Sequence, residues 1–251
     1  MLPFDAILFD LGNTLIYFDS DNPEAIYAKS DQVLLDYLEE SGGLHLDRET
    51  FIRELEARQK AYDLERDTIY KEYSEEYVVK TILQAMGYPE PAPEILRRAL
   101  DAKFAISQAY WKSETDTQDT LQALRDKGYR IGLISNAGDD RDVQVLIDNA
   151  HIRPFLDVIL VSAAEGICKP HAQLFKRALN HLDTQPSRAV MVGDYLKGDI
   201  LGAHNSGMHG IWITRRAHHK YNEPHLGKII PDATISTLSE LVPLLEKLVL
   251  Q

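Results

Sequence analysis

The sequence predicts an α/β fold in which a Rossmann-like parallel sheet is flanked by helices and carries an inserted all-helical domain. Three patterns support this prediction. From residue 117 onward, short apolar strands alternate with helical segments, as in parallel sheets with helical crossovers. Four of the apolar strands lead, directly or through a short loop, to Asp, Ser or Lys. After the first strand, roughly a hundred residues show helical periodicity and no convincing strand.

These patterns divide the chain into two domains. We expect residues 1–16 and 114–251 to form the α/β core and residues 17–113 to form a helical cap domain. The chain has 251 residues, of which 44% are hydrophobic, and this suffices for a substantial core.

The inserted region begins after an apolar strand at residues 5–10 and contains four expected helices. Asn22 is a suitable cap for the first helix, and Asp47 precedes the second. Ser74 caps the third helix, and a proline-rich segment leads into the fourth, which extends to about Tyr110. Tyr62, Tyr70 and Tyr73 lie in or beside these helices, where aromatic residues normally pack, although some of them can face a substrate.

The core resumes with alternating elements. Further strands are expected at 130–134, 157–161, 188–192, 210–213 and 233–235. The helices between and after them are expected to end before Gly128, to cover 140–149, 171–182 and 199–206, and to close the chain as a leucine-rich segment.

Charge and composition exclude several classes of function. The net charge of −12 argues against binding to nucleic acid, which requires clustered Lys and Arg. No segment approaches the ~20 apolar residues of a membrane helix, and the amino terminus has no basic leader. A single cysteine, Cys168, cannot form an internal disulfide. We therefore expect a cytoplasmic protein, either a monomer or a homodimer.

Carboxylates follow two of the predicted strands. Asp10 ends the first strand, and the loop after it, beginning with Leu11 and Gly12, can present backbone N–H groups to an anion. Asp194 and Asp199 follow the strand at 188–192 in the pattern GDxxxxD. Because loops at the carboxyl ends of parallel strands share one crevice, these three carboxylates are expected to meet. Their mutual repulsion favours a bound cation, and Mg²⁺ is the oxygen-seeking choice.

Two other strands supply polar groups to the same edge. Ser135 and Asn136 follow the strand at 130–134, where a hydroxyl and backbone amides can bind phosphoryl oxygens. Lys169 lies in a loop after the strand at 157–161, and its ammonium can neutralise a nucleophile and a transferring phosphoryl group.

The order and spacing of these residues resemble the haloacid dehalogenase-like hydrolase superfamily. FDLGNTL, LISN, GICKP and VGDYLKGD are similar to its four motifs, and the insertion resembles the helical cap of its phosphoglycolate-phosphatase-like and dehalogenase-like branch. The resemblance implies that Asp10 is a nucleophile that forms an aspartyl phosphate, and that Lys169 neutralises and orients. It implies phosphate binding by Leu11, Ser135, Asn136 and Lys169, and Mg²⁺ binding by Asp10, the Gly12 carbonyl, Asp194 and Asp199.

The expected activity is hydrolysis of a small phosphorylated metabolite, a phosphomonoester. One departure matters, because phosphatases of this family usually carry a general-acid Asp where this chain has Gly12. Asp19, Asp21 or a cap residue can substitute for it. The absence of that Asp leaves two alternatives open: a 2-haloacid dehalogenase, and a non-catalytic module that binds phosphate and metal. The GDxxxxD pair favours the phosphatase over the dehalogenase.

Overall fold

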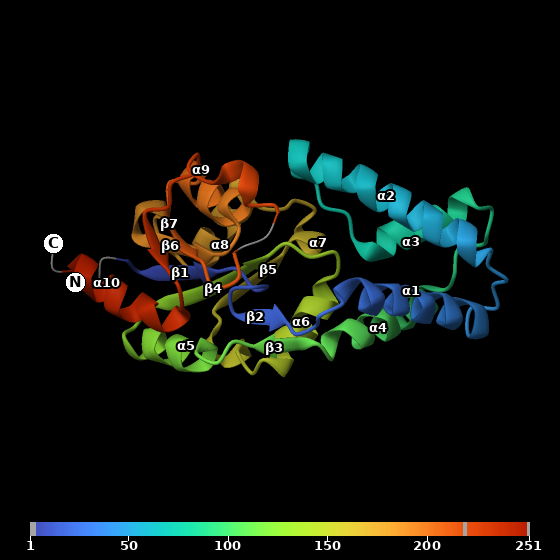
Figure 1. The fold of residues 1–251 in the computed structure, drawn as a ribbon, viewed down its shortest axis with the longest axis horizontal. Coiled ribbons are helices and arrows are strands. Elements are labelled where there is room, and N and C mark those ends of the chain that lie inside the picture. The colour runs from blue at the N-terminus through green and yellow to red at the C-terminus, as the bar shows by residue number, and fades with distance from the viewer. Residues whose placement is uncertain (1–3, 218–219, 250–251) are drawn as a thin grey trace.

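The computed structural model describes residues 4–217 and 220–249, and it shows an α/β core at one end and a group of helices at the other (Figure 1). The core contains a six-stranded sheet in the order β5-β4-β1-β6-β7-β8, and every neighbouring pair is parallel. The predicted fold class is therefore confirmed. The strands are β1 (Ala6–Phe9), β4 (Arg130–Ser135), β5 (Val158–Val161), β6 (Ala189–Gly193), β7 (His209–Ile213) and β8 (Ala233–Ile235).

Alternate residues of the central strand pack on opposite faces of the sheet, as the two-residue period of a strand requires. Ile7 and Phe9 join the cluster beneath one set of helices, while Ala6 and Leu8 join the cluster beneath the other. The first face is covered by α5 (Thr117–Asp126), α6 (Asp140–Asn149) and α10 (Leu241–Val249). The second face is covered by α8 (Ala172–His181) and α9 (Gly202–Asn205).

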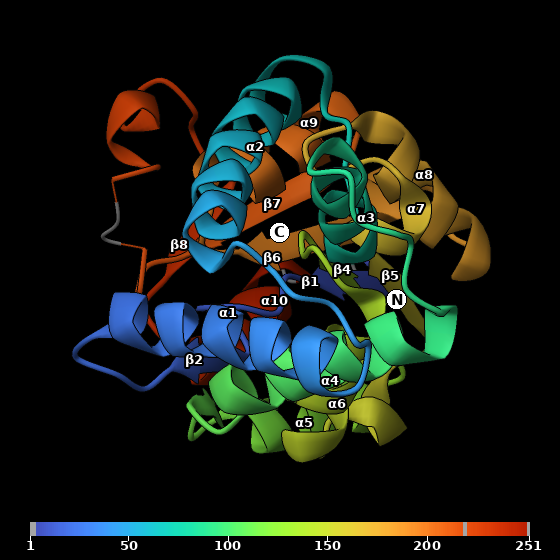
Figure 2. The same cartoon turned by 90° about the vertical axis from the view of Figure 1, so that its right-hand side faces the viewer.

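Four helices form the inserted region and share a hydrophobic cluster of their own. They are α1 (Pro23–Glu40), α2 (Arg48–Ile69), α3 (Glu75–Ala85) and α4 (Pro93–Gln108). They lie as two pairs, α1 with α4 and α2 with α3 (Figure 2). The side chains of Asn22, Asp47 and Ser74 cap α1, α2 and α3 as expected, because each accepts a hydrogen bond from a backbone N–H three residues later.

The expectation that the inserted region lacks strands is wrong at its two ends. There, β2 (Ile16–Phe18) and β3 (Trp111–Ser113) form a two-stranded antiparallel ribbon. Three residues are too few to show an alternating pattern, so the sequence contains no periodic signal for either strand. The pairing is stabilised by aromatic contact, since the rings of Phe18 and Trp111 lie 5.3 Å apart in an edge-to-face arrangement.

The segment between α2 and α3 is attached to two loops of the core. The N–H of Glu72 donates to the carbonyl of Gly166 at 3.1 Å, and the N–H of Cys168 donates to the carbonyl of Tyr70 at 3.0 Å. The N–H of Glu75 donates to the carbonyl of Gly138 at 2.7 Å. We call residues 70–75 the docking segment. It joins the inserted helices to the loop that also carries Lys169.

Shorter elements complete the core. They are α7 (Ser162–Glu165), a π-helical turn (Leu196–Leu201) and 3₁₀ turns at Arg153–Phe155, Pro186–Arg188, Glu223–His225 and Leu238–Glu240. The helix expected at 199–206 therefore begins earlier, at Leu196, and continues into α9. Across residues 4–217 and 220–249, none of the helices has the length and apolar composition needed to cross a bilayer.

A glycine in β4 tests the packing of the sheet. A Cβ added to Gly132 would lie 2.4 Å from Leu8 Cδ2 and 2.8 Å from Val158 Cγ1. We expect Gly132→Ala to lower the free energy of unfolding by about 1–3 kcal/mol, because the overpacked side chains must shift. Urea unfolding measures this change. Gly138→Ala is the control, since its Cβ has no neighbour closer than 3.9 Å; equal stability of the two variants would contradict the packing argument.

Candidate active site

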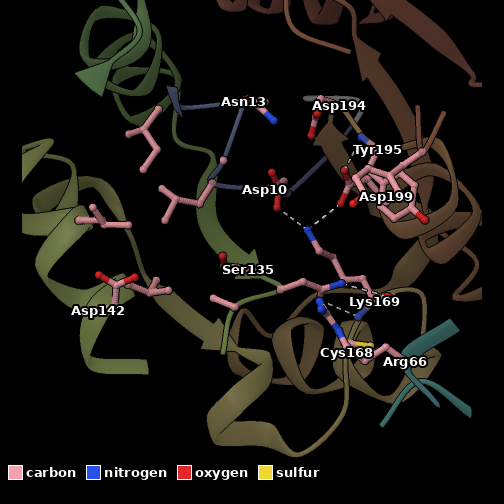
Figure 3. A pocket seen from close by; sticks show the side chains of 18 of the residues that line it. Asp10, Asn13, Arg66, Ser135, Asp142, Cys168, Lys169, Asp194, Tyr195 and Asp199 are labelled. Carbon is pink, nitrogen blue, oxygen red and sulfur yellow. Dashed lines mark hydrogen bonds and ion pairs between the residues drawn. The ribbon is translucent and has the colours of Figure 1, made fainter. Parts of the chain in front are cut away.

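The predicted site residues meet at the carboxyl edge of the sheet. After β1 the chain builds β4 and β5 on one side and then returns to build β6 on the other, which is the switch point where α/β folds bind ligands. A cavity of about 520 Å³ opens there (Figure 3). All eight predicted residues line it: Asp10, Leu11, Gly12, Ser135, Asn136, Lys169, Asp194 and Asp199.

Lys169 lies at the centre of the polar cluster. Its Nζ donates to Asp10 Oδ1 at 2.6 Å and to Asp199 Oδ1 at 2.7 Å, and its side chain reaches between them in Figure 3. Burial alone would lower the pKa of Lys169, but Asp10 and Asp199 outweigh it and raise the pKa. The ammonium is therefore charged at neutral pH and positioned beside Asp10.

The two carboxylates bound by Lys169 belong to a cluster of three. Oxygens of Asp10, Asp194 and Asp199 all lie within 4.8 Å of one another. Burial raises the pKa of Asp199 to about 7, Lys169 opposes this shift, and Asp10 and Asp194 add to it. With the carboxylates ionised, the cluster holds two more negative than positive charges. The donor set consists of hard oxygen ligands, so it fits a divalent cation such as Mg²⁺.

Ser135 lines the cavity beside the polar cluster. Among the described residues, none forms a hydrogen bond with its hydroxyl, although the residue is only 5% exposed. The hydroxyl is thus oriented toward the cavity with its donor available for an oxyanion. Asn136 is arranged differently, because both polar atoms of its amide bind the backbone of Lys169, at 3.1 Å and 2.8 Å. This side chain holds the lysine loop in place, and its binding of phosphate stays a prediction.

The loop after β6 is held by residues that the sequence did not reveal. The carbonyl of Asp194 accepts hydrogen bonds from Trp212 Nε1 at 2.9 Å and from Asn222 Nδ2 at 2.8 Å. Asn222 Oδ1 accepts from the N–H of Leu196 at 2.9 Å. A buried asparagine in a distant polar loop gives no periodic or motif signal, so its role is visible only from the structure.

Gly12 faces an indole ring. A Cβ added at this position would lie 3.4 Å from Trp111 Cη2, so the ring covers the direction in which a longer side chain would extend. Asp19 and Asp21, considered as replacement acids, are not among the residues that line the cavity. Neither residue is therefore placed to act as the general acid in place of Gly12.

The three tyrosines singled out in the inserted region also lie outside the lining of this cavity. Tyr62 and Tyr73 pack against the helical cluster, and their rings stack with centroids 4.2 Å apart. The ring of Tyr70 contacts His171 in an edge-to-face arrangement. Their packing agrees with the helical spacing of these residues.

Asp142 lines the cavity although the sequence analysis did not select it. It lies in the first turn of α6, three residues after the N-cap Asp139, where an acidic side chain normally reaches back to the cap. Instead, its Oδ1 accepts a hydrogen bond from Gln108 Nε2 of α4 at 2.9 Å. Burial raises the pKa of Asp142 to about 6, and the nearby Asp139 contributes, while Gln108 and Arg97 oppose the shift.

The raised pKa of Asp142 predicts a pH-dependent effect on stability. The folded protein binds this proton more tightly than the unfolded chain, so the buried charge costs stability as pH rises from about 4 to about 6. We expect Asp142→Asn to stabilise the protein by about 1–2 kcal/mol at pH 7.5, less than the full shift implies because the carboxyl borders an open cavity.

Unfolding midpoints from pH 4 to 8 measure this effect, and the gain should disappear near pH 4. Asp140→Asn is the control, because Asp140 lies exposed on the same helix. A gain that is independent of pH would contradict the assignment.

The chain is similar in sequence to phosphatases of two archaea. A glyceraldehyde 3-phosphate phosphatase from Methanopyrus kandleri is 28% identical over 97% of this chain and 97% of that protein. A glyceraldehyde 3-phosphate phosphatase from Pyrococcus furiosus is 32% identical, and this match spans 55% of the chain and 56% of that protein's length.

A solved structure extends the comparison to the fold. A 2-haloacid dehalogenase from Pseudomonas syringae pv. Tomato DC3000 superposes with a TM-score of 0.66 at 24% identity, covering 98% of this chain and 99% of that one. This likeness shows a shared fold and leaves the chemistry to the site. The model of the haloacid dehalogenase-like hydrolases matches residues 4–207, and the chain therefore belongs to this family.

Proposed function

We propose that this protein is a metal-dependent phosphatase that hydrolyses small phosphomonoesters through an aspartyl phosphate. The observation that carries the proposal is the cluster of Asp10, Asp194 and Asp199 beside an open cavity, with Lys169 bound to Asp10 and Asp199. The names of the relatives from Methanopyrus and Pyrococcus support a small phosphorylated substrate.

In the proposed reaction, a carboxylate oxygen of Asp10 attacks phosphorus, and the bond from phosphorus to the alcohol oxygen breaks. The ammonium of Lys169 and the hydroxyl of Ser135 stabilise negative charge on the phosphoryl oxygens, as does the N–H of Leu11. Water then attacks phosphorus, which frees Asp10 and releases inorganic phosphate. Because Gly12 provides no acid, the departing alkoxide takes its proton from water, so esters with good leaving groups react faster.

We propose Mg²⁺ as the cofactor. Asp10, Asp194, Asp199 and the carbonyl of Gly12 would hold it, and the excess of negative charge in this cluster supports the choice. When bound, a divalent cation offsets the repulsion among these carboxylates and that of the incoming phosphate.

The helical insertion serves, in this proposal, as a cap over the site, with residues 17–113 as the cap and residues 1–16 and 114–251 as the core. The β2–β3 ribbon lies at the two points where the chain passes between these parts. A cap that closes excludes water during the first step. The buried free thiol of Cys168 supports a cytoplasmic location.

Two other activities remain to be separated from this one. A dehalogenase is favoured by Gly12, but it has no use for the three-carboxylate cluster. A non-catalytic phosphate-binding module is also favoured by Gly12, although Asp10 and Lys169 are arranged as a reactive pair. One assay distinguishes all three.

The assay measures phosphate release from an aryl phosphate, with Mg²⁺ and with chelator, and halide release from a 2-haloacid. We expect Mg²⁺-dependent phosphate release that Asp10→Asn reduces at least about 10³-fold, because the nucleophile is lost. Asp19→Asn is the matched control, since it removes a carboxylate outside the cavity. Halide release in chelator would instead identify a dehalogenase, and no turnover of either substrate would favour the binding module.

Magnesium binding is tested separately by stability. A cation at 100 times its Kd stabilises the fold by about 2.7 kcal/mol through mass action. We expect saturating Mg²⁺ to raise the melting temperature of the wild type, and Asp194→Asn to remove most of this rise because one of three carboxylates is lost. An equal rise in both proteins would place the cation elsewhere.

A further inference from the structure

The cavity has two kinds of lining. Its charged residues come mainly from the loops after β1 and β6, from the Lys169 loop and from α2. The part contributed by α1, α4, β3 and α6 is largely aromatic and aliphatic, and we call it the aromatic wall. It consists of Tyr27, Phe104, Ser107, Trp111, Val143 and Leu146, together with Asp142.

Among the residues of the aromatic wall, Asp142 carries the only carboxyl group. Figure 3 shows it apart from the cluster of Asp10, Lys169 and Asp199. A phosphate held by that cluster would direct the rest of a small substrate away from Lys169 and into the remaining cavity. The carboxyl of Asp142 is thus placed to meet the alcohol part of the substrate rather than its phosphate.

The carboxyl retains acceptor capacity for a ligand. Among the described residues, only Gln108 donates a hydrogen bond to it, and an ionised carboxylate offers about four acceptor positions. Within residues 4–217 and 220–249, no basic side chain is bonded to it; Arg97 pairs instead with Asp139 at 2.7 Å and with Asp101 at 2.9 Å. The helix does not require Asp142 as a cap, since the side chain of Asp139 already provides one.

We propose that Asp142 selects the substrate by accepting a hydrogen bond from a donor, a hydroxyl or an ammonium, at the end remote from the phosphate. The inference rests on the proposed phosphatase function and narrows its substrate class. A carboxylate at this position favours hydroxylated or amino phosphate esters over alkyl esters, and it disfavours a second anionic group by charge repulsion. The cost of burying this charge, argued above, is consistent with a group kept for binding rather than for stability.

The test compares glycerol 1-phosphate with n-propyl phosphate, which have the same chain length and differ in their hydroxyls. Binding is measured by calorimetry in Mg²⁺ with the Asp10→Asn protein, which does not turn the esters over. We expect glycerol phosphate to bind at least about 10-fold more tightly, and Asp142→Ala in the same background to remove this preference while changing propyl phosphate binding less than about twofold.

A second pair, 2-aminoethyl phosphate and ethyl phosphate, identifies the donor. A preference confined to this pair and removed by Asp142→Asn assigns an ammonium, whereas a preference confined to glycerol phosphate assigns a hydroxyl. Asp142→Leu keeps the approximate size of the side chain but accepts no hydrogen bond, so it serves in place of Asp142→Ala if the latter does not fold. Asp140→Asn is the charge-matched control.

The outcomes separate the inference from the function. Phosphate release by the wild type, with no preference or with an equal loss for both esters in the Asp142 variants, overturns the inference and keeps the phosphatase. A preference that depends on Asp142, in a wild type that releases no phosphate, keeps the selective site and overturns the phosphatase.

Discussion

An excess of buried negative charge is the constraint on which the site depends. Three carboxylates lie close together, and one ammonium pairs with two of them; such an arrangement persists only where the surrounding structure holds each group in place. The supports come from opposite sides. Asn136 fixes the backbone of Lys169, while Asn222 and Trp212 fix the carbonyl of Asp194. These neutral amides and the indole add no charge of their own. The excess negative charge of the cluster is therefore left to be neutralised by a bound cation.

The inserted region contributes side chains to the lining of the cavity. Trp111 comes from the ribbon at the base of this region, and its ring lies 3.4 Å from the position that a Cβ on Gly12 would take. Gln108 of α4 donates a hydrogen bond to Asp142 of α6, so the aromatic wall is assembled from the inserted helices and from the core. The end of the cavity that contains Asp10 and Lys169 is thus built almost entirely by the core. The opposite end is lined by residues of both the core and the inserted region.

The sequence revealed what depends on periodicity and on strand ends. Asp10 and Asp194 follow buried strands and Ser135 ends one, and the parallel topology then requires them to meet. It did not reveal β2 and β3, because three residues carry no period, nor Asn222, whose function depends on a contact with a loop 28 residues away. The position of Asp142 in the cavity could not be predicted for another reason. An acidic residue three positions after an N-cap Asp139 is ordinary at the start of a helix, so it gives no sign of a binding role.

The docking segment has a mechanical consequence. The inserted helices are tied to the core by the continuous chain at the β2–β3 ribbon and, across the cavity, by hydrogen bonds of residues 70–75. Any movement of the inserted helices away from the core would have to break the hydrogen bonds of the docking segment, together with the ion pairs Arg97–Asp139 and Lys197–Asp67. The N–H of Cys168 donates to the carbonyl of Tyr70, and Cys168 immediately precedes Lys169, so the docking segment holds the same loop that Asn136 holds from the core. The position of the Lys169 ammonium is therefore linked, through the backbone of its own loop, to the seating of the inserted helices on the core.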